Sequence, residues 1–288
     1  MNKLKYLPLL LLCILGAASV NAQDSASNVA ITLERTACFG TCPVYTITIL
    51  EDGTVNYEGQ DFVDVTGKQT SELTPETVKQ MVAAFEKAGY FDWKETYDTQ
   101  IVTDLPTVMT SVTLDGKIHS ISHYMGDYTA PLELTFLEQW VDEMANSQLW
   151  TGVEPDTSAI SNGTDTPLVT LQRNQCFGNC PVYDVALFAD GTVVYAGIAN
   201  VNNIGVYTFQ ADAAAITGIT QRAQAFKYFD WQDSYEERIM TDQATVTTSI
   251  RTEDQFKRIV RYNGDPNAPV GLTWIEGSID QLITTLAG

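Results

Sequence analysis

The chain contains one sequence pattern twice, at a constant spacing of 138 residues. Residues 38–45 read Cys-Phe-Gly-Thr-Cys-Pro-Val-Tyr, and residues 176–183 read Cys-Phe-Gly-Asn-Cys-Pro-Val-Tyr. The spacing continues without a gap through Asp52-Gly53, Phe91-Asp92-Trp93 and Thr103-Asp104, which recur as Asp190-Gly191, Phe229-Asp230-Trp231 and Thr241-Asp242. We therefore predict one domain built twice, and any function assigned to one copy has to be tested against the residues of the other.

Residues 1–22 are typical of a signal peptide. Lys3 and Lys5 precede a short apolar run, and Val20-Asn21-Ala22 is a small-residue cleavage site. The run is too short to span a bilayer as an anchor. Processing as a lipoprotein at Cys13 is disfavoured because Leu12, rather than a small residue, precedes it. We expect an exported protein, periplasmic or secreted, with no membrane span after signal removal.

The remaining chain is predicted to hold two domains. The first repeat covers residues 29–150 and the second covers 168–288, and the turn-forming residues of 151–167 make a linker. Each repeat of about 120 residues is long enough to bury its own core. We expect a monomer whose two halves are related by a pseudo-twofold axis.

The composition is strongly acidic. The formal net charge is −20, and it becomes −22 without the signal peptide because residues 1–22 contain two lysines and no acid. Nucleic acid and anionic membrane surfaces would repel such a protein. The charge therefore excludes nucleic acid as a partner and favours a soluble protein whose partner is an unknown protein or a cell-envelope component.

Local patterns predict an α+β fold in each repeat. Tyr45, Ile47 and Ile49 alternate with threonines, which indicates a half-buried strand, and Asp52-Gly53 marks a hairpin turn. A helix is expected from Pro75 to Gly89, with Thr74 as its N-cap, and a second helix after Pro131. The same order recurs in the second copy. We expect two tandem repeats, each an antiparallel sheet with two helices packed on it.

The four cysteines outside the signal peptide all lie in the repeated motif. They allow three pairings. Because each repeat carries its own pair, the simplest pattern joins Cys38 to Cys42 and Cys176 to Cys180. Gly40 and Gly178 would allow a positive φ in the short loops. A closed loop of about five residues stabilises the fold by roughly 2 kcal/mol.

Two reactive alternatives to a structural disulfide remain open. The Cys-x-x-x-Cys-Pro string also resembles the metal-binding loop of the Sco copper chaperones, which have a thioredoxin fold and a histidine beside the thiols. Here His119 and His123 belong to the first copy, and Lys257 and Arg261 replace them in the second. A zinc site shared by four thiolates is the other alternative. We predict no metal and no cofactor.

Several polar residues recur and are candidates for structural or binding roles. They are Arg35, Tyr45 and Asp104 in the first copy, and Arg173, Tyr183 and Asp242 in the second. Asp104 is expected to cap backbone N–H groups or to pair with Arg35. Glu138 and Asp142 lie four residues apart on the last helix of the repeat, where an acidic pair is usually solvated. We assign no catalytic residue, and an enzyme built around Asp104 is the weakest hypothesis.

The repeated motif resembles that of a known family. With Asp52-Gly53-x-Val55-x-Tyr57-x-Gly59 and Thr103-Asp104-x-Pro106, it is similar to a family of exported bacterial domains of unknown function. The resemblance covers nearly all of both copies, although Ala244 replaces Pro106 in the second. It implies a bacterial extracytoplasmic protein and no particular reaction. We predict a non-enzymatic binding or interaction module, with a thiol redox or copper-handling protein as the alternative.

Overall fold

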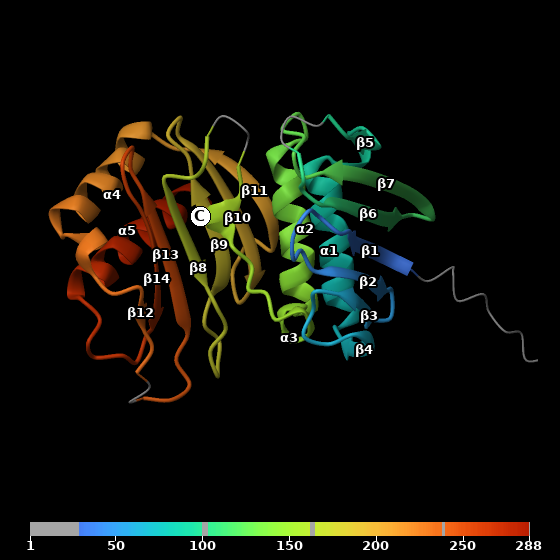
Figure 1. Cartoon of the computed structure of the whole chain (residues 1–288), viewed down its shortest axis with the longest axis horizontal. Helices are drawn as coiled ribbons and strands as arrows, with labels where there is room; N and C mark the ends of the chain where they lie inside the picture. Colours follow the sequence, from blue (N-terminus) through green and yellow to red (C-terminus); the bar gives the residue numbers. More distant parts are fainter. Residues whose placement is uncertain (1–28, 100–102, 162–164, 238–239, 288) are drawn as a thin grey trace, which may run out of the picture.

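The computed structural model describes residues 29–99, 103–161, 165–237 and 240–287. The predicted signal peptide lies outside these residues. Each repeat forms a seven-stranded sheet with helices on one face, so the predicted class of two α+β repeats is confirmed (Figure 1). Among the helices described, none is long and apolar enough to cross a membrane.

The first sheet has the strand order β4-β3-β2-β1-β6-β7-β5. All neighbours are antiparallel except β5, which pairs parallel with β7. The prediction of a purely antiparallel sheet was therefore wrong at this edge. Its elements are β1 (Val29–Arg35), β2 (Val44–Leu50), β3 (Thr54–Asp61), β4 (Gly67–Glu72), α1 (Pro75–Ala88), η2 (Tyr90–Asp92), β5 (Thr96–Tyr97), β6 (Thr107–Leu114), β7 (Lys117–Tyr124) and α2 (Leu132–Ala145).

The second sheet repeats this topology in the order β11-β10-β9-β8-β13-β14-β12. Between the repeats lie a further short helix, α3 (Gln148–Thr151), and the 3-10 helix η3 (Thr157–Ala159), so the helices are not limited to two per repeat. The elements of the second repeat are β8 (Val169–Arg173), β9 (Val182–Leu187), β10 (Thr192–Ala199), β11 (Gly205–Gln210), α4 (Ala213–Ala225), η4 (Tyr228–Asp230), β12 (Ser234–Tyr235), β13 (Thr245–Arg251), β14 (Phe256–Tyr262) and α5 (Val270–Ala287).

The two repeats stack head to tail. Helices α1 and α2 pack on their own sheet on one side and on strands β10 and β11 of the second repeat on the other. The layers therefore alternate as sheet, helices, sheet, helices across the molecule (Figure 1). A twofold axis would bring like faces together, whereas here a helix face meets a sheet face. The expected pseudo-twofold relation was wrong.

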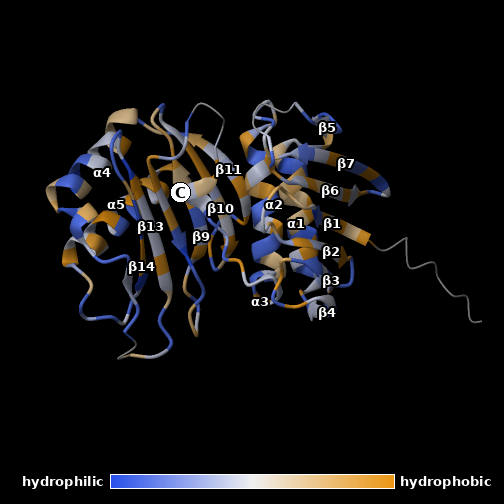
Figure 2. Ribbon diagram, in the orientation of Figure 1, coloured by the Kyte–Doolittle hydropathy of each residue, from blue (hydrophilic) through white to orange (hydrophobic). Residues whose placement is uncertain are grey.

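Sequence differences between the copies explain this stacking. Thr48 and Asn56 of the first sheet face away from its helices, and Ala186 and Val194 occupy the equivalent, buried positions of the second sheet. Hydrophobic residues thus line both faces of β9 and β10 (Figure 2). Trp140 on α2 completes the contact, since its indole N–H donates to the carbonyl of Gly197 at 2.9 Å. Apolar burial holds the halves together.

A half-buried acid, Glu143, and a buried acid, Asp184, also lie at this junction. Glu143 comes from α2 and Asp184 from β9, and Gln139 Nε2 lies 3.0 Å from Glu143 Oε1 and 3.1 Å from Asp184 Oδ2. Asp184 also accepts hydrogen bonds from Thr157 and Gln172. Burial and the neighbouring charge of Asp184 raise the pKa of Glu143 well above its usual value. The junction therefore favours the neutral form of Glu143 beside Asp184.

Candidate functional site

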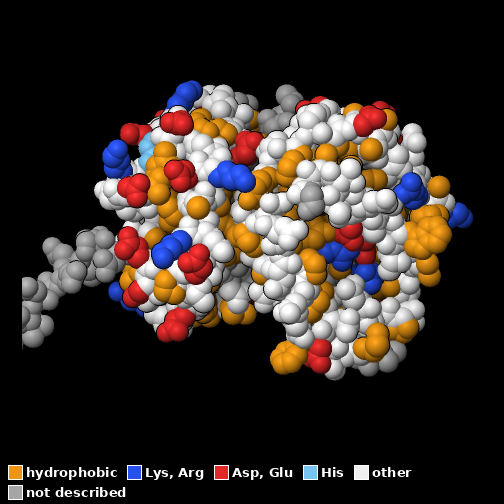
Figure 3. Space-filling model, turned by 180° about the vertical axis from the view of Figure 1, so that it is seen from behind, with side chains coloured by type: hydrophobic (Ala, Val, Ile, Leu, Met, Phe, Trp, Pro, Cys, Tyr) orange, Lys and Arg blue, Asp and Glu red, His pale blue; other side chains and the backbone are white. Residues whose placement is uncertain are grey.

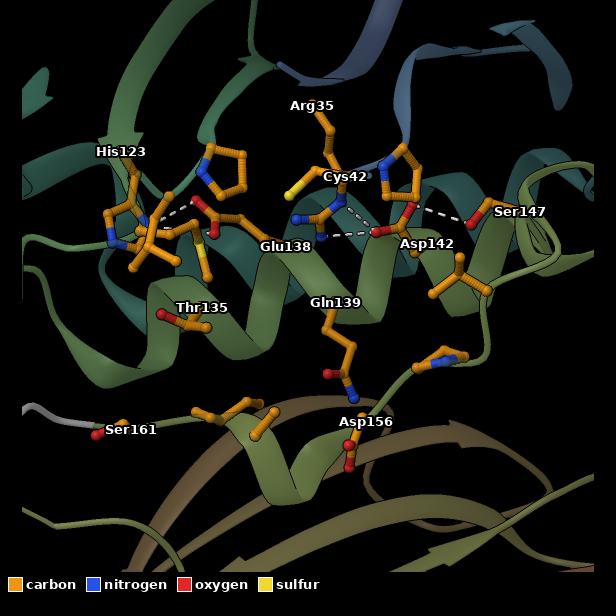
Figure 4. Close-up of a pocket in the computed structure, with 18 of the residues that line it drawn as sticks. Arg35, Cys42, His123, Thr135, Glu138, Gln139, Asp142, Ser147, Asp156 and Ser161 are labelled. Atoms are coloured by element: carbon orange, nitrogen blue, oxygen red, sulfur yellow. Dashed lines mark hydrogen bonds and ion pairs between the residues drawn. The ribbon is translucent and has the colours of Figure 1, made fainter. Parts of the chain in front are cut away.

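The best-defined polar cluster of the first repeat centres on Asp142 of α2. Arg35 ends β1 and Tyr45 is its cross-strand partner in β2, so both side chains face the helices. Arg35 lies 2.6 Å from Asp142 Oδ2 through Nη2, and Tyr45 donates its hydroxyl to Oδ1 at 2.6 Å. Ser147 donates to the same Oδ1 at 3.0 Å (Figure 4). Three side chains from separate segments thus satisfy one nearly buried carboxylate.

The surroundings of Arg35 and Tyr45 shift the pKa of both side chains upward. Burial lowers the pKa of Arg35, but the charge of Asp142 raises it overall. Burial and the charge of Asp142 raise the pKa of Tyr45 well above 10. Arg35 is therefore a permanent cation and Tyr45 a permanent neutral donor. The cluster forms a rigid platform of satisfied charges.

A second ion pair lies one helical turn earlier on α2. His123 of β7 and Glu138 are both almost completely buried, and His123 Nδ1 lies 3.0 Å and 3.1 Å from the two carboxylate oxygens (Figure 4). Burial lowers the pKa of His123, but Glu138 and Asp127 raise it overall. The surroundings therefore favour the protonated imidazole against the glutamate.

The second repeat contains the same arrangement. Arg173 and Tyr183 bind Asp280 of α5, and Arg173 reaches it with both Nε and Nη2. Arg261 takes the place of His123 and binds Glu276. Both copies therefore keep a cation against this buried glutamate, although its chemical type differs. A general acid–base role would require a titrating group here, which Arg261 is not.

The disulfides form within each repeat, as predicted. Cys38 is bonded to Cys42 and Cys176 to Cys180, with Cα–Cα distances of 5.7 Å and 5.8 Å. Neither Gly40 nor Gly178 has a positive φ, so that expectation was wrong. Positive φ values instead occur at 72° in Asp104 and 68° in Asp242.

Each disulfide loop rests on the loop that carries the recurring Thr-Asp pair. The N–H of Phe39 donates to the carbonyl of Asp104 at 3.2 Å, and that of Phe177 to the carbonyl of Asp242 at 3.3 Å. The carboxylate of Asp104 accepts from Thr103. Asp142 is the carboxylate that binds Arg35. The structure thus brings Arg35 and Tyr45 together with Asp142, and it gives Asp104 a backbone role beside the cysteines.

A cavity of about 440 Å³ opens over the first copy of the charged cluster. Its floor is formed by the two ion pairs of α2, and one rim includes Cys42 and Pro43 of the disulfide loop. The opposite rim is the segment 153–161 between the repeats (Figure 4). Apolar side chains make up much of the wall, namely Leu105, Pro106, Met125, Leu132, Val153, Pro155 and Ile160.

The two charged clusters differ in their exposure to solvent. The Asp142 side chain is 9% exposed beneath the cavity and the segment 153–161, whereas that of Asp280 is 37% exposed. Equivalent residues are thus partly enclosed in the first repeat and open to solvent in the second. Their surroundings, and not the cluster itself, create the cavity.

The sequence interpretation missed the two acids at the centre of the site. Glu138 and Asp142 were expected to be solvated, yet their residues are only 1% and 7% exposed. A signal was present, because the 138-residue spacing also repeats them as Glu276 and Asp280. Helical spacing alone could not show that two strands place cations over this face of α2.

Fold and site together define a two-repeat α+β protein with a disulfide-closed loop and a duplicated ion-pair cluster in each repeat. The profile of a family described as Domain of unknown function (DUF6438) matches residues 29–145 and 167–283. The chain therefore belongs to this family and carries two copies of its domain. No curated protein and no solved structure matches the chain.

Proposed function

We propose that this protein is a non-enzymatic binding module of the bacterial cell envelope, and that the cavity of the first repeat is its ligand site. One observation carries this proposal: the cavity has apolar walls over a floor whose charged groups are already paired with one another. Apolar walls with a few fixed polar groups are the usual composition of ligand pockets. The predicted signal peptide and the two disulfides support an extracytoplasmic location.

The charges around the cavity favour one class of ligand. Arg35 and His123 are neutralised by Asp142 and Glu138. The exposed Glu154 and Asp156 lie on the rim, where Arg258 approaches Asp156 to 4.0 Å. An anionic ligand would meet these rim acids and a net charge of −20. A neutral or cationic molecule with a large apolar portion suits the cavity best.

The neutral apolar dye N-phenyl-1-naphthylamine tests this assignment. Thr135 of α2 lines the cavity, and Thr273 is the equivalent, exposed residue of α5. We expect dye fluorescence to rise on titration into the native protein and into Thr273→Trp. It should not rise with Thr135→Trp, because the indole fills the cavity.

Equal dye binding by both tryptophan variants would contradict the proposal, as would an absence of binding by the native protein. Circular dichroism melting curves of both variants serve as the folding control. Dye binding by the native protein and by Thr273→Trp, but not by Thr135→Trp, would place the dye in this cavity.

A further inference from the structure

The phenylalanine of the repeated motif is displayed to solvent in both copies. Phe39 is 89% exposed and Phe177 is 87% exposed, and they are the two most exposed large hydrophobic side chains of the described residues. Burying a phenylalanine side chain normally stabilises a fold. Each repeat forgoes this stabilisation at the same position of the same motif.

The exposure does not result from how the repeats pack. Helices α1 and α2 of the first repeat are covered by the second sheet, whereas α5 of the second repeat exposes Val270 and Trp274. Phe39 and Phe177 nevertheless have almost the same exposure in these different surroundings. The local loop structure sets it.

Each phenylalanine also lies on a backbone that is held in place. It directly follows the first cysteine of a disulfide that closes a five-residue loop, and its backbone N–H is bound to the neighbouring Thr-Asp loop. That supporting loop is itself anchored, because the hydroxyls of Tyr124 and Tyr262 accept hydrogen bonds from the N–H groups of Leu105 and Gln243. These bonds hold the loop backbone in the position that displays each phenylalanine.

We propose that the two disulfide loops are anchors that insert Phe39 and Phe177 into apolar pockets of a partner protein in the same compartment. A loop backbone that is fixed before binding loses little conformational entropy on binding, and aromatic side chains contribute strongly to the binding energy of many interfaces. Two anchors on one rigid body would also raise the effective concentration of the second contact.

The charge of the molecule selects the kind of partner. On the face seen in Figure 3, acidic side chains gather mainly over one half, among hydrophobic and basic ones. The exposed Asp104 and Asp242 support the two disulfide loops. An anionic lipid surface would be repelled. The partner is therefore a protein whose apolar pockets are bordered by neutral or basic side chains.

Photo-crosslinking in the intact exporting cell tests this proposal. The full chain would carry p-benzoylphenylalanine, which closely resembles phenylalanine, at position 39, at position 177 or at the control position Phe256, which is 45% exposed. We expect the same partner protein to be linked from 39 and from 177, at about ten times the yield from 256. Peptide mapping should place both links in apolar pockets of that partner. Adducts with lipid only, adducts with a second copy of this chain, or equal yields at all three positions would overturn the proposal.

A second measurement separates anchoring from folding. In the double variant Phe39→Ser/Phe177→Ser we expect an unchanged melting temperature and a loss of about tenfold or more in affinity for the linked partner. A large fall in the melting temperature would assign the side chains to stability instead. This variant should still bind N-phenyl-1-naphthylamine. Retained dye binding would show that the loss of partner affinity does not come from damage to the cavity.

Discussion

Asp142 is the residue on which the charged cluster of the first repeat depends. Its carboxylate is the acceptor for Arg35, Tyr45 and Ser147, so its removal leaves a largely buried guanidinium without a counter-charge. The equivalent Asp280 serves Arg173 and Tyr183 but is more than a third exposed, and water can replace part of its interaction.

We predict that Asp142→Ala lowers the free energy of unfolding by about 3 kcal/mol, the usual loss when one partner of a buried ion pair is removed. Asp280→Ala should cost about 1 kcal/mol, within the range of exposed pairs. Urea unfolding followed by tryptophan fluorescence measures both. Equal losses would mean that the enclosure of the first cluster has no energetic effect.

His123 is expected to make the first repeat sensitive to pH. Because its pKa is raised in the folded protein, its contribution to stability is fully present below the unfolded value of about 6.5. That contribution is lost as the pH rises through the raised folded pKa. In the second repeat, Arg261 stays charged throughout this range.

The variant His123→Arg should therefore remove this part of the pH dependence. Melting temperatures measured between about pH 5 and 9 are expected to fall less steeply for the variant than for the native protein. Identical slopes would show that the His123–Glu138 pair does not contribute to stability.

At the level of single elements, structure encoded by nearby residues could be predicted well. Thr74 caps α1 through its hydroxyl, Pro75 begins the helix, and Gly89 ends it with a φ of 86°, all as expected from the sequence. The strand β5 was missed because Thr96 and Tyr97 form it only by pairing with the distant β7. Caps and turns depend on adjacent residues, whereas a two-residue strand depends on the finished sheet.

The disulfide loops are local structural elements as well. Each closes five residues and connects two strands, so we predict that Cys38→Ser/Cys42→Ser and Cys176→Ser/Cys180→Ser each lower the free energy of unfolding by about 2 kcal/mol. Urea unfolding checks the magnitude.

A thiol redox function would instead require that the same disulfides are readily reduced. If both bridges are structural, thiol titration in a glutathione buffer should find the cysteines oxidised. Ready reduction of either bridge in that buffer would favour redox chemistry.

On the scale of the whole molecule, the stacking of the repeats was not predicted, although the sequence contains its signature. Ala186 and Val194 replace Thr48 and Asn56 where α1 and α2 cover the second sheet. On the helices, Arg222 and Ser278 replace Ala84 and Trp140, and Arg222 donates to Ser278 at 2.5 Å. The differences between the copies on these two faces indicate the contact, whereas the motifs that the copies share do not.

The junction between the repeats should also respond to pH through Glu143. Because burial beside Asp184 raises the pKa of Glu143, its protonated form stabilises the junction at low pH. This stability declines as the pH rises above the unfolded value of about 4.3 towards the raised folded pKa.

We predict that Glu143→Gln, which introduces the residue found at the equivalent position 281, makes the protein more stable than the native form at neutral pH. An amide can still donate to Asp184 without adding a buried charge. Melting temperatures at about pH 5 and pH 7 should differ less in the variant than in the native protein. A variant that is less stable than the native protein at pH 7 would contradict a destabilising charge on Glu143.

The head-to-tail stack makes the order of the two copies part of the fold. A chain with the copies exchanged would turn Ala186 and Val194 towards water and would set Arg222 and Ser278 against a sheet of threonines. Such an exposed apolar sheet is a template for aggregation. After the duplication, each copy became adapted to its own place in the chain, so a transposed gene would encode the same two domains and yet an insoluble protein.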